Sequence, residues 1–185
     1  MRKDLGPKPI LYPQPVLIIA TYDAQGIPNA MNAAWGGISE ENEITICIDS
    51  GHKTAANLKA RGAFTVSMAD EAHVAACDYV GIVSGNKEPH KLEKAGFHTM
   101  KSTFVDAPLI EELPMALECR VKSYDEDTCR LVGEIVNVCA DERILSDGKI
   151  DPKKLRPITF DPVHHTYIAL GEPVGRAFFD GTKLK

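Results

Sequence analysis

The sequence has no long apolar run and no excess of basic residues, and each absence excludes a class of protein. The longest window without a charged residue, 24–39, is shorter than the roughly 20 mostly apolar residues that a membrane-spanning helix needs, and it contains Gly, Pro and Asn. The formal net charge is −5, so the composition gives no support for nucleic-acid binding, which requires a basic surface. No signal-like apolar segment follows Met1, and we therefore expect a cytoplasmic protein.

Cysteine and glycine motifs are also missing. The five cysteines form no C-x-x-C motif, and their odd number in a chain of 185 residues argues against a disulfide framework. His164 and His165 are the only adjacent pair of histidines, and adjacent residues on a strand point to opposite faces. No G-x-G-x-x-G motif occurs either. We expect no metal site and no dinucleotide-binding fingerprint.

The chain instead contains many residues that interrupt secondary structure, 14 glycines and 12 prolines. Their frequency favours many short strands over a few long helices. Apolar and β-branched runs predict strands at 16–22, 28–35, 44–48, 63–68, 116–123, 129–140 and 165–170. Helical segments are expected at 55–61, 69–82 and 90–95. The sequence thus predicts a single domain over residues 1–185, mainly β, with an antiparallel barrel and a few short flanking helices.

One turn, two glycine-containing positions and one strand carry further expectations. Asp23–Gly26 is typical of a turn, Gly36-Gly37 should end the second strand, and Gly62 should end the first helix. The segment 129–140 is apolar on both faces, so either helices or a second subunit must cover it.

The segment Ser50-Gly51-His52-Lys53-Thr54 lies between a predicted strand and a predicted helix. A helix N-terminus has unpaired N–H groups and a partial positive charge, so it binds anions. Two hydroxyl groups and Lys53 would add donors and a full charge for a phosphate. The alternative is an ordinary helix start with a solvated lysine, and the residues alone leave both open.

The second candidate is Asn29–Gly37, which is rich in Ala and Gly and packs poorly as a strand. Small residues would let a flat ligand lie close to the backbone; a bend at a barrel corner, with Trp35 in the core, is the alternative. The third candidate is Ser84-Gly85-Asn86-Lys87 with Lys91, for which a solvated surface loop is the alternative. The fourth candidate is His164-His165 with Tyr167. Its alternative is that one histidine points outward and the other is buried in the core.

Taken together, the segments resemble the flavin reductase-like family, and within it the flavoredoxins most. The resemblance runs in order over nearly the whole chain: 12–23, 26–37, 54–58 before the strand 63–66, 79–85, 107–110, 117–119, 132–135 and 170–175. One departure concerns 90–92, which is His-Lys-Leu where the family often has Asp-Lys-Phe, so Lys91 is retained without its acidic neighbour.

The resemblance implies a homodimeric FMN-binding split β-barrel of Greek-key type. It implies that the 29–35 strand lies along the isoalloxazine, that the 50–54 loop holds the phosphate, and that a second subunit completes the site. One of the two histidines, His164 or His165, would donate a hydrogen bond to the flavin or cover its open face. The implied cofactor-binding residues are Asn29, Met31, Asn32, Ala33, Ala34, Trp35, Ser50, Gly51, His52, Lys53, Thr54, Asn57, Ser84, Gly85, Lys91 and His165.

The function that the resemblance implies is an FMN-dependent oxidoreductase or electron-transfer protein of the flavoredoxin type, with flavin-centred chemistry and no catalytic side chain. A nicotinamide, bound transiently, or a ferredoxin-type protein would be the electron donor. Three alternatives stay open: an NAD(P)H-dependent flavin reductase that releases reduced flavin, a non-catalytic flavin-binding dimer, and a pyridoxamine-phosphate oxidase type of enzyme.

Overall fold

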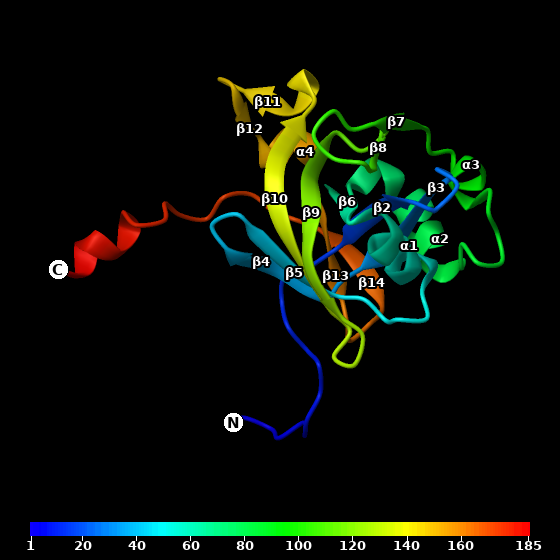
Figure 1. Cartoon of the computed structure of the whole chain (residues 1–185). Helices are drawn as coiled ribbons and strands as arrows, with labels where there is room; N and C mark the ends of the chain where they lie inside the picture. The colour runs from blue at the N-terminus through cyan, green and yellow to red at the C-terminus, as the bar shows by residue number, and fades with distance from the viewer.

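The computed structural model describes all residues, 1–185, and its centre is a curled, antiparallel sheet of seven strands that forms a half-barrel (Figure 1). The strand order is β3-β2-β6-β9-β10-β5-β4. The strands are β2 (Leu17–Tyr22), β3 (Pro28–Ala33), β4 (Gly36–Glu40), β5 (Glu43–Cys47), β6 (Ala63–Met68), β9 (Met115–Asp125) and β10 (Arg130–Ala140). The prediction of a mainly β, split-barrel fold is confirmed.

Smaller elements surround this sheet. Strands β1 (Gln14–Pro15), β13 (Ile158–Asp161) and β14 (Thr166–Ala169) form a three-stranded sheet; β7 (Thr99–Lys101) pairs with β8 (Pro108–Ile110), and β11 (Leu145–Ser146) with β12 (Lys149–Ile150). The helices are α1 (Lys53–Arg61), η1 (Glu71–His73), α2 (Val74–Ile82), α3 (Lys91–Ala95), η2 (Glu142–Ile144), α4 (Pro152–Leu155) and η3 (Asp180–Leu184). None of the helices is long and apolar enough to cross a membrane.

Strand β2 lies between two hydrophobic cores, which explains why its sequence is apolar without interruption. Leu17 and Ile19 point into the half-barrel, where they pack with Phe64, whereas Ile18 and Ala20 face the layer of α2 and α3. Because side chains alternate across a strand, a strand that is covered on both faces needs apolar residues at every position. The two cores place the end of α2 beside β3, at the edge of the sheet.

The barrel core is closed at Gly133, where β10 bulges against β9. A Cβ on Gly133 would lie 2.3 Å from Cζ of Phe64, a fully buried side chain. We therefore expect Gly133→Ala to destabilise the fold by about 1–3 kcal/mol, because Phe64 must leave its rotamer or the strands must separate. Chemical denaturation followed by circular dichroism measures this. Gly37→Ala, at a position with open space around the added methyl group, is the control, and equal stability of the two variants would contradict the prediction.

Two boundaries were predicted wrongly. Gly36 and Gly37 do not end the second strand; they begin β4, where a side chain on Gly36 would meet Ile46 and Leu17. The helix predicted over 69–82 begins only at Glu71, because the carboxylate of Asp70 accepts a hydrogen bond from His73 N and starts a 3-10 turn. By contrast, Gly62 ends α1 as predicted, in the left-handed conformation with φ of 65°.

Candidate functional site

Three neighbouring cavities lie along β3 and the residues that follow it. The first, which we call the helix-end cavity, has a volume of about 200 Å³. It lies between β3, the start of α1, the end of α2 and the start of α3. Its lining residues are Asn29, Met31, His52, Lys53, Thr54, Val80, Gly81, Ile82, Val83, Ser84, Gly85 and Lys91.

The other two cavities continue from it. The sheet-edge cavity, about 250 Å³, shares Gly81 and Ile82 with the first and is lined further by Val16, Asn32, Ala33, Ala34, Asp78, Phe160 and Tyr167. The lead-in cavity, about 430 Å³, shares Ala34 with the second and lies between Trp35-Gly36 and the N-terminal residues 8–15. Since β3 is the last strand of the sheet, the backbone groups of its outer edge have no partner strand. An elongated polar and flat ligand therefore has a continuous path along this edge.

The start of α1 provides hydrogen-bond donors to the helix-end cavity. The side chain of His52 makes no capping bond, and the first turn contains no acidic residue. The backbone N–H groups of Lys53 and Thr54 have no acceptor in the protein. Thr54 is buried, and its hydroxyl accepts a hydrogen bond from Asn29 Nδ2 at 3.1 Å, so it can donate its own proton to a ligand. Free N–H groups and the helix dipole together make this end of the cavity suited to an anion.

The charge of Lys53 is less available to a ligand than the sequence suggested. Its ammonium group donates to the carboxylate of Asp23 at 3.0 Å. That carboxylate also accepts the backbone N–H groups of Gln25 and Ile27 in the β2–β3 turn. These hydrogen bonds hold the pKa of Asp23 below its usual value although its burial acts in the opposite direction. Lys53 thus lines the cavity with its stem while its charge is shared with Asp23.

Asn29 and Gly85 meet on the opposite wall. The amide oxygen of Asn29 is buried and has no hydrogen-bond partner. A Cβ on Gly85 would lie 2.2 Å from this oxygen and 3.2 Å from Cδ of Lys53. Only glycine lets the 84–85 backbone come so close to β3. A buried acceptor without a partner costs free energy, and here it lies in the wall of a cavity that a ligand with a donor group could fill.

Lys91 is the one buried cation of the cavity. Only 3% of its surface is exposed, and its ammonium group donates to the backbone oxygens of Val80 at 3.0 Å and Val83 at 2.9 Å, near the end of α2. No carboxylate pairs with it, and burial lowers its pKa to about 8. One of its three N–H donors remains unused. Lys91 therefore shapes the loop after α2 and also brings positive charge to the cavity.

The sheet-edge cavity has a polar pair of its own. The hydroxyl of Tyr167 on β14 donates to the carboxylate of Asp78 on α2 at 2.7 Å. Burial, and then this hydrogen bond, raise the pKa of Tyr167 to about 12. Asn32 on β3 donates to Cys77 O at 3.2 Å, and Gly81 brings α2 close to Asn32. These contacts fix the distance between α2 and β3.

Twelve of the predicted site residues lie in these cavities. Eight line the helix-end cavity, and Asn32, Ala33, Ala34 and Trp35 line the next two. Trp35 is 58% exposed, so the alternative that placed it in the core is wrong.

The structure places four predicted residues outside the cavities. Ser50 and Gly51 precede the helix start and are exposed, and Asn57 is buried and donates to Thr21 Oγ1 at 3.0 Å. His165 is exposed and stacks on Phe160, with ring centres 6.3 Å apart. The other histidine, His164, is also exposed and is bound to Asp161 at 2.7 Å, so neither is a core residue.

Sequence reasoning missed the residues that belong to the end of α2 and to β13. Val80–Val83, Asp78 and Phe160 line the cavities, but only Val80–Val83 had a signal in the sequence, since they belong to the segment 79–85 that resembles the family. Tyr167 was noted only as a neighbour of the histidine pair. Its 89-residue separation from Asp78 shows why the pairing could not be inferred.

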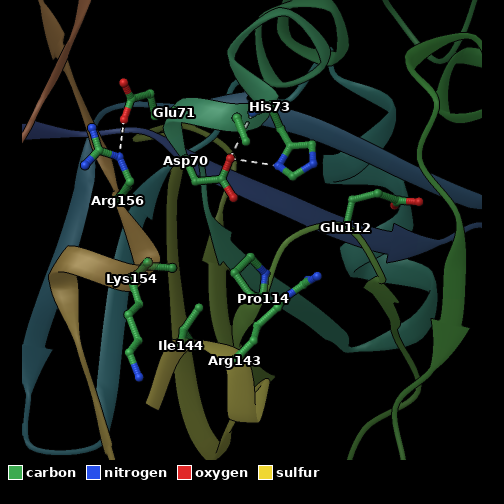
Figure 2. A pocket seen from close by; sticks show the side chains of 11 residues that line it. Asp70, Glu71, His73, Glu112, Pro114, Arg143, Ile144, Lys154 and Arg156 are labelled. Carbon is green, nitrogen blue, oxygen red and sulfur yellow. Dashed lines mark hydrogen bonds and ion pairs between the residues drawn. The ribbon is translucent and has the colours of Figure 1, made fainter. Parts of the chain in front are cut away.

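A larger cavity, about 590 Å³, lies elsewhere, between η1, η2 and α4. Figure 2 shows its side chains: Arg156 is paired with Glu71, and His73 with Asp70 at 2.7 Å. Arg143 is paired with Asp141 at 3.4 Å, and Lys154 donates to Leu145 O. Because His73, Arg143 and Arg156 are all paired with carboxylates, whereas Lys91 of the helix-end cavity is paired with none, this cavity offers an anion less than the helix-end cavity does.

The family model of the flavin reductase-like domain matches residues 10–155 of the chain. The flavoredoxin of Desulfovibrio vulgaris (Miyazaki F) is 38% identical in sequence, with a TM-score of 0.94, over 98% of this chain and 100% of that structure. The flavoredoxin of Methanosarcina acetivorans is 27% identical, with a TM-score of 0.90, over the whole of both chains. An uncharacterised protein of Escherichia coli K12, YddH, is 29% identical over 86% of this chain and 88% of its own length.

Proposed function

The chain belongs to the flavin reductase-like family, and we propose that it is a homodimeric FMN-binding oxidoreductase of the flavoredoxin type, which passes hydride or electrons through its flavin. The observation that carries the proposal is the helix-end cavity. It combines an uncapped helix start, a buried cation without a carboxylate partner and a buried amide oxygen without a donor. These three features complement a ligand that has both an anionic group and polar groups.

The residues fit FMN along the edge of β3. The N–H groups of Lys53 and Thr54 and the hydroxyl of Thr54 would hold the phosphate. Asn29 would accept a hydrogen bond from the flavin, and Lys91 would place positive charge beside it. When bound, the flavin supplies the hydride- and electron-transfer chemistry. The protein binds and orients it, and Lys91 favours a flavin that carries more negative charge.

No side chain has to act as nucleophile or general base in this proposal. The carboxylate nearest to the sheet-edge cavity, Asp78, is occupied by the hydroxyl of Tyr167. That pair instead positions α2 against β14, and it keeps the wall of the cavity in place.

A second copy would cover the exposed apolar residues of the barrel. Val138 on β10 is half-exposed, and Ile38 on β4, two strands away in the same sheet, is 64% exposed. The apolar character of both faces of 129–140 has the same explanation. Aromatic and aliphatic side chains exposed together are typical of subunit interfaces.

Spectroscopy of the purified protein tests the function. We expect a yellow protein, or one that quenches the fluorescence of added FMN, and that keeps its flavin through gel filtration. Stopped-flow reduction with NADH, NADPH and reduced ferredoxin then identifies the donor. Loss of flavin on the column with rapid NAD(P)H-driven turnover of free flavin would favour a flavin reductase. Retention without reduction by any donor would favour a binding module, and absence of any FMN binding would refute the proposal.

Lys53→Glu should weaken FMN binding at least tenfold, with the largest loss at low salt. The new carboxylate would stand at the helix start beside the proposed phosphate position and opposite Asp23, so it repels both. Fluorescence-quenching titrations at two ionic strengths measure the effect. Lys59→Glu, on the same helix but exposed and far from its start, is the matched control. Equal affinities of the two variants would remove Lys53 from the site.

A further inference from the structure

The last residues of the chain, 171–185, form an arm that projects away from the body of the protein (Figure 1). The last hydrogen bond to the body runs from Leu170 N to Pro157 O at 3.3 Å, and the last ion pair joins Glu172 to Lys153. From Pro173 onward, every hydrogen bond and ion pair of the arm is internal. The arm is therefore not held by its own body.

The arm nevertheless has a defined local structure. The guanidinium group of Arg176 lies over the ring of Phe179 at 4.1 Å, and the carboxylate of Asp180 accepts the backbone N–H of Arg176 at 2.7 Å. Val174, Phe178 and Leu184 are almost fully exposed. A shaped segment that presents large apolar side chains to water is an unpartnered binding element, because burying such side chains drives association.

The same chain carries a surface that suits the arm. We call it the Trp35 surface; it consists of Trp35, Ile38 and the lead-in cavity, whose walls include Ile10 and Leu11. Its strand, β4, is the edge strand at the other end of the seven-stranded sheet from β3, and both chain ends leave the body on the β4 side (Figure 1).

Charge also matches between the arm and this surface. The exposed residues Glu40 and Glu41 lie at the end of β4 and directly after it, while the arm carries Lys185, which has no ion pair, and Lys183, which is paired with Asp180 of the arm itself. Opposite charges on the two elements favour their contact over contact between like surfaces.

We propose that two copies of the chain exchange their C-terminal arms, so that the arm of one copy packs on the Trp35 surface of its partner. This inference rests on the homodimer proposed above. A second copy is the partner that suits the Trp35 surface, because the arm and the surface lie on the same chain. In a dimer with a two-fold axis, each arm packs on the surface of the other copy, so both arm–surface contacts form at once. Since the lead-in cavity shares Ala34 with the sheet-edge cavity, the partner's arm comes to the mouth of the flavin site and completes its wall.

Photo-crosslinking of the full-length protein with FMN tests the exchange. Phe178 is replaced by p-benzoyl-phenylalanine in a mixture of ¹⁴N- and ¹⁵N-labelled chains. We expect crosslinked peptides of mixed isotope content that join the arm to peptides containing residues 8–11 or 34–40. Phe104, half-exposed and outside the arm, is the matched control position and should give no such product. Products of one isotope only, products joining the arm to another region, or no product would overturn the exchange.

Dimer stability provides a second, independent measurement. Phe178→Ser should raise the dimer dissociation constant at least tenfold in sedimentation equilibrium, whereas Phe104→Ser should leave it unchanged. Equal constants for the two variants would overturn the exchange but leave the dimer intact. A monomeric wild-type protein would refute both dimer and exchange, and FMN titration of the same samples reports separately on flavin binding.

Discussion

Gly85→Ala should abolish FMN binding, with a loss of affinity of at least a hundredfold. The added methyl carbon would lie 2.2 Å from Asn29 Oδ1, inside the wall of the helix-end cavity. Asn29 is held by its hydrogen bond to Thr54, so the contact is relieved either by a shift of the 84–85 loop away from β3 or by the loss of that hydrogen bond. Either change alters the wall of the cavity that we assign to the flavin. Fluorescence quenching of FMN measures the loss.

Two further variants separate an effect on the site from an effect on the fold. Asn86→Ala changes the next, exposed residue of the same loop and should bind FMN like the wild type. The double variant Gly85→Ala/Asn29→Ala removes the clashing oxygen, so it should recover the melting temperature of the wild type but not its affinity. Undiminished binding by Gly85→Ala alone would exclude this cavity as the flavin site.

Lys91→Met should weaken FMN binding and remove its dependence on pH above neutrality. In the wild type, the pKa of Lys91 is about 8, so the ammonium group is charged at pH 7 and loses its charge as the pH rises through about 8. An anionic ligand prefers the charged form, and the affinity for FMN should therefore fall above pH 8. Titrations from pH 6.5 to 9.5 measure this, and an equal fall in Lys91→Met would assign the dependence to another group.

Folding stability should show the opposite trend, since burial disfavours the charged form of Lys91. The unfolded chain binds this proton up to a pH of about 10.5, whereas the folded protein releases it near 8. Lys91 should thus contribute a rise in the stability of the flavin-free protein between these pH values, of about 3 kcal/mol for a shift of this size. The two hydrogen bonds to Val80 O and Val83 O survive deprotonation, because a neutral amine still has two donors. Burial raises the pKa of the Cys77 and Cys119 thiols to about 12, which lowers the stability of the wild type and of Lys91→Met alike above pH 9. Urea unfolding at pH 7 and pH 10 should therefore show that the wild type gains stability relative to Lys91→Met, and an unchanged difference between the two proteins would contradict the prediction.

Much of the fold follows from local rules. Strand β6 covers the predicted residues 63–68, and Gly62 ends α1 because only glycine adopts its left-handed conformation without strain. The turn at Asp23–Gly26 is stabilised by the Asp23 carboxylate, as residues of this type predict. The prediction that Gly36-Gly37 ends a strand was wrong because glycine at position 36 is required by packing between strands. A side chain on Gly36 would collide with Ile46 and Leu17 from other strands.

Only part of the candidate site could be predicted from the sequence. The uncapped start of α1 and the small residues of β3 are local features, and they lie together in the structure. Lys91, in contrast, appears in sequence as one lysine among other charged residues. Its burial arises only because α3 packs under the end of α2, which directs its ammonium group to two backbone oxygens.

By itself, the sequence determined the strands, the turns and the family resemblance, because alternation, glycine conformation and helix starts depend on neighbouring residues. Only the tertiary structure decided which groups meet at the cavities: Asn29 with Gly85, Lys91 with the end of α2, and Asp78 with Tyr167. It also decided that residues 171–185 leave the body with their apolar side chains exposed. These outcomes depend on how distant segments pack, and packing energies between segments far apart in the chain leave no periodic pattern in the sequence.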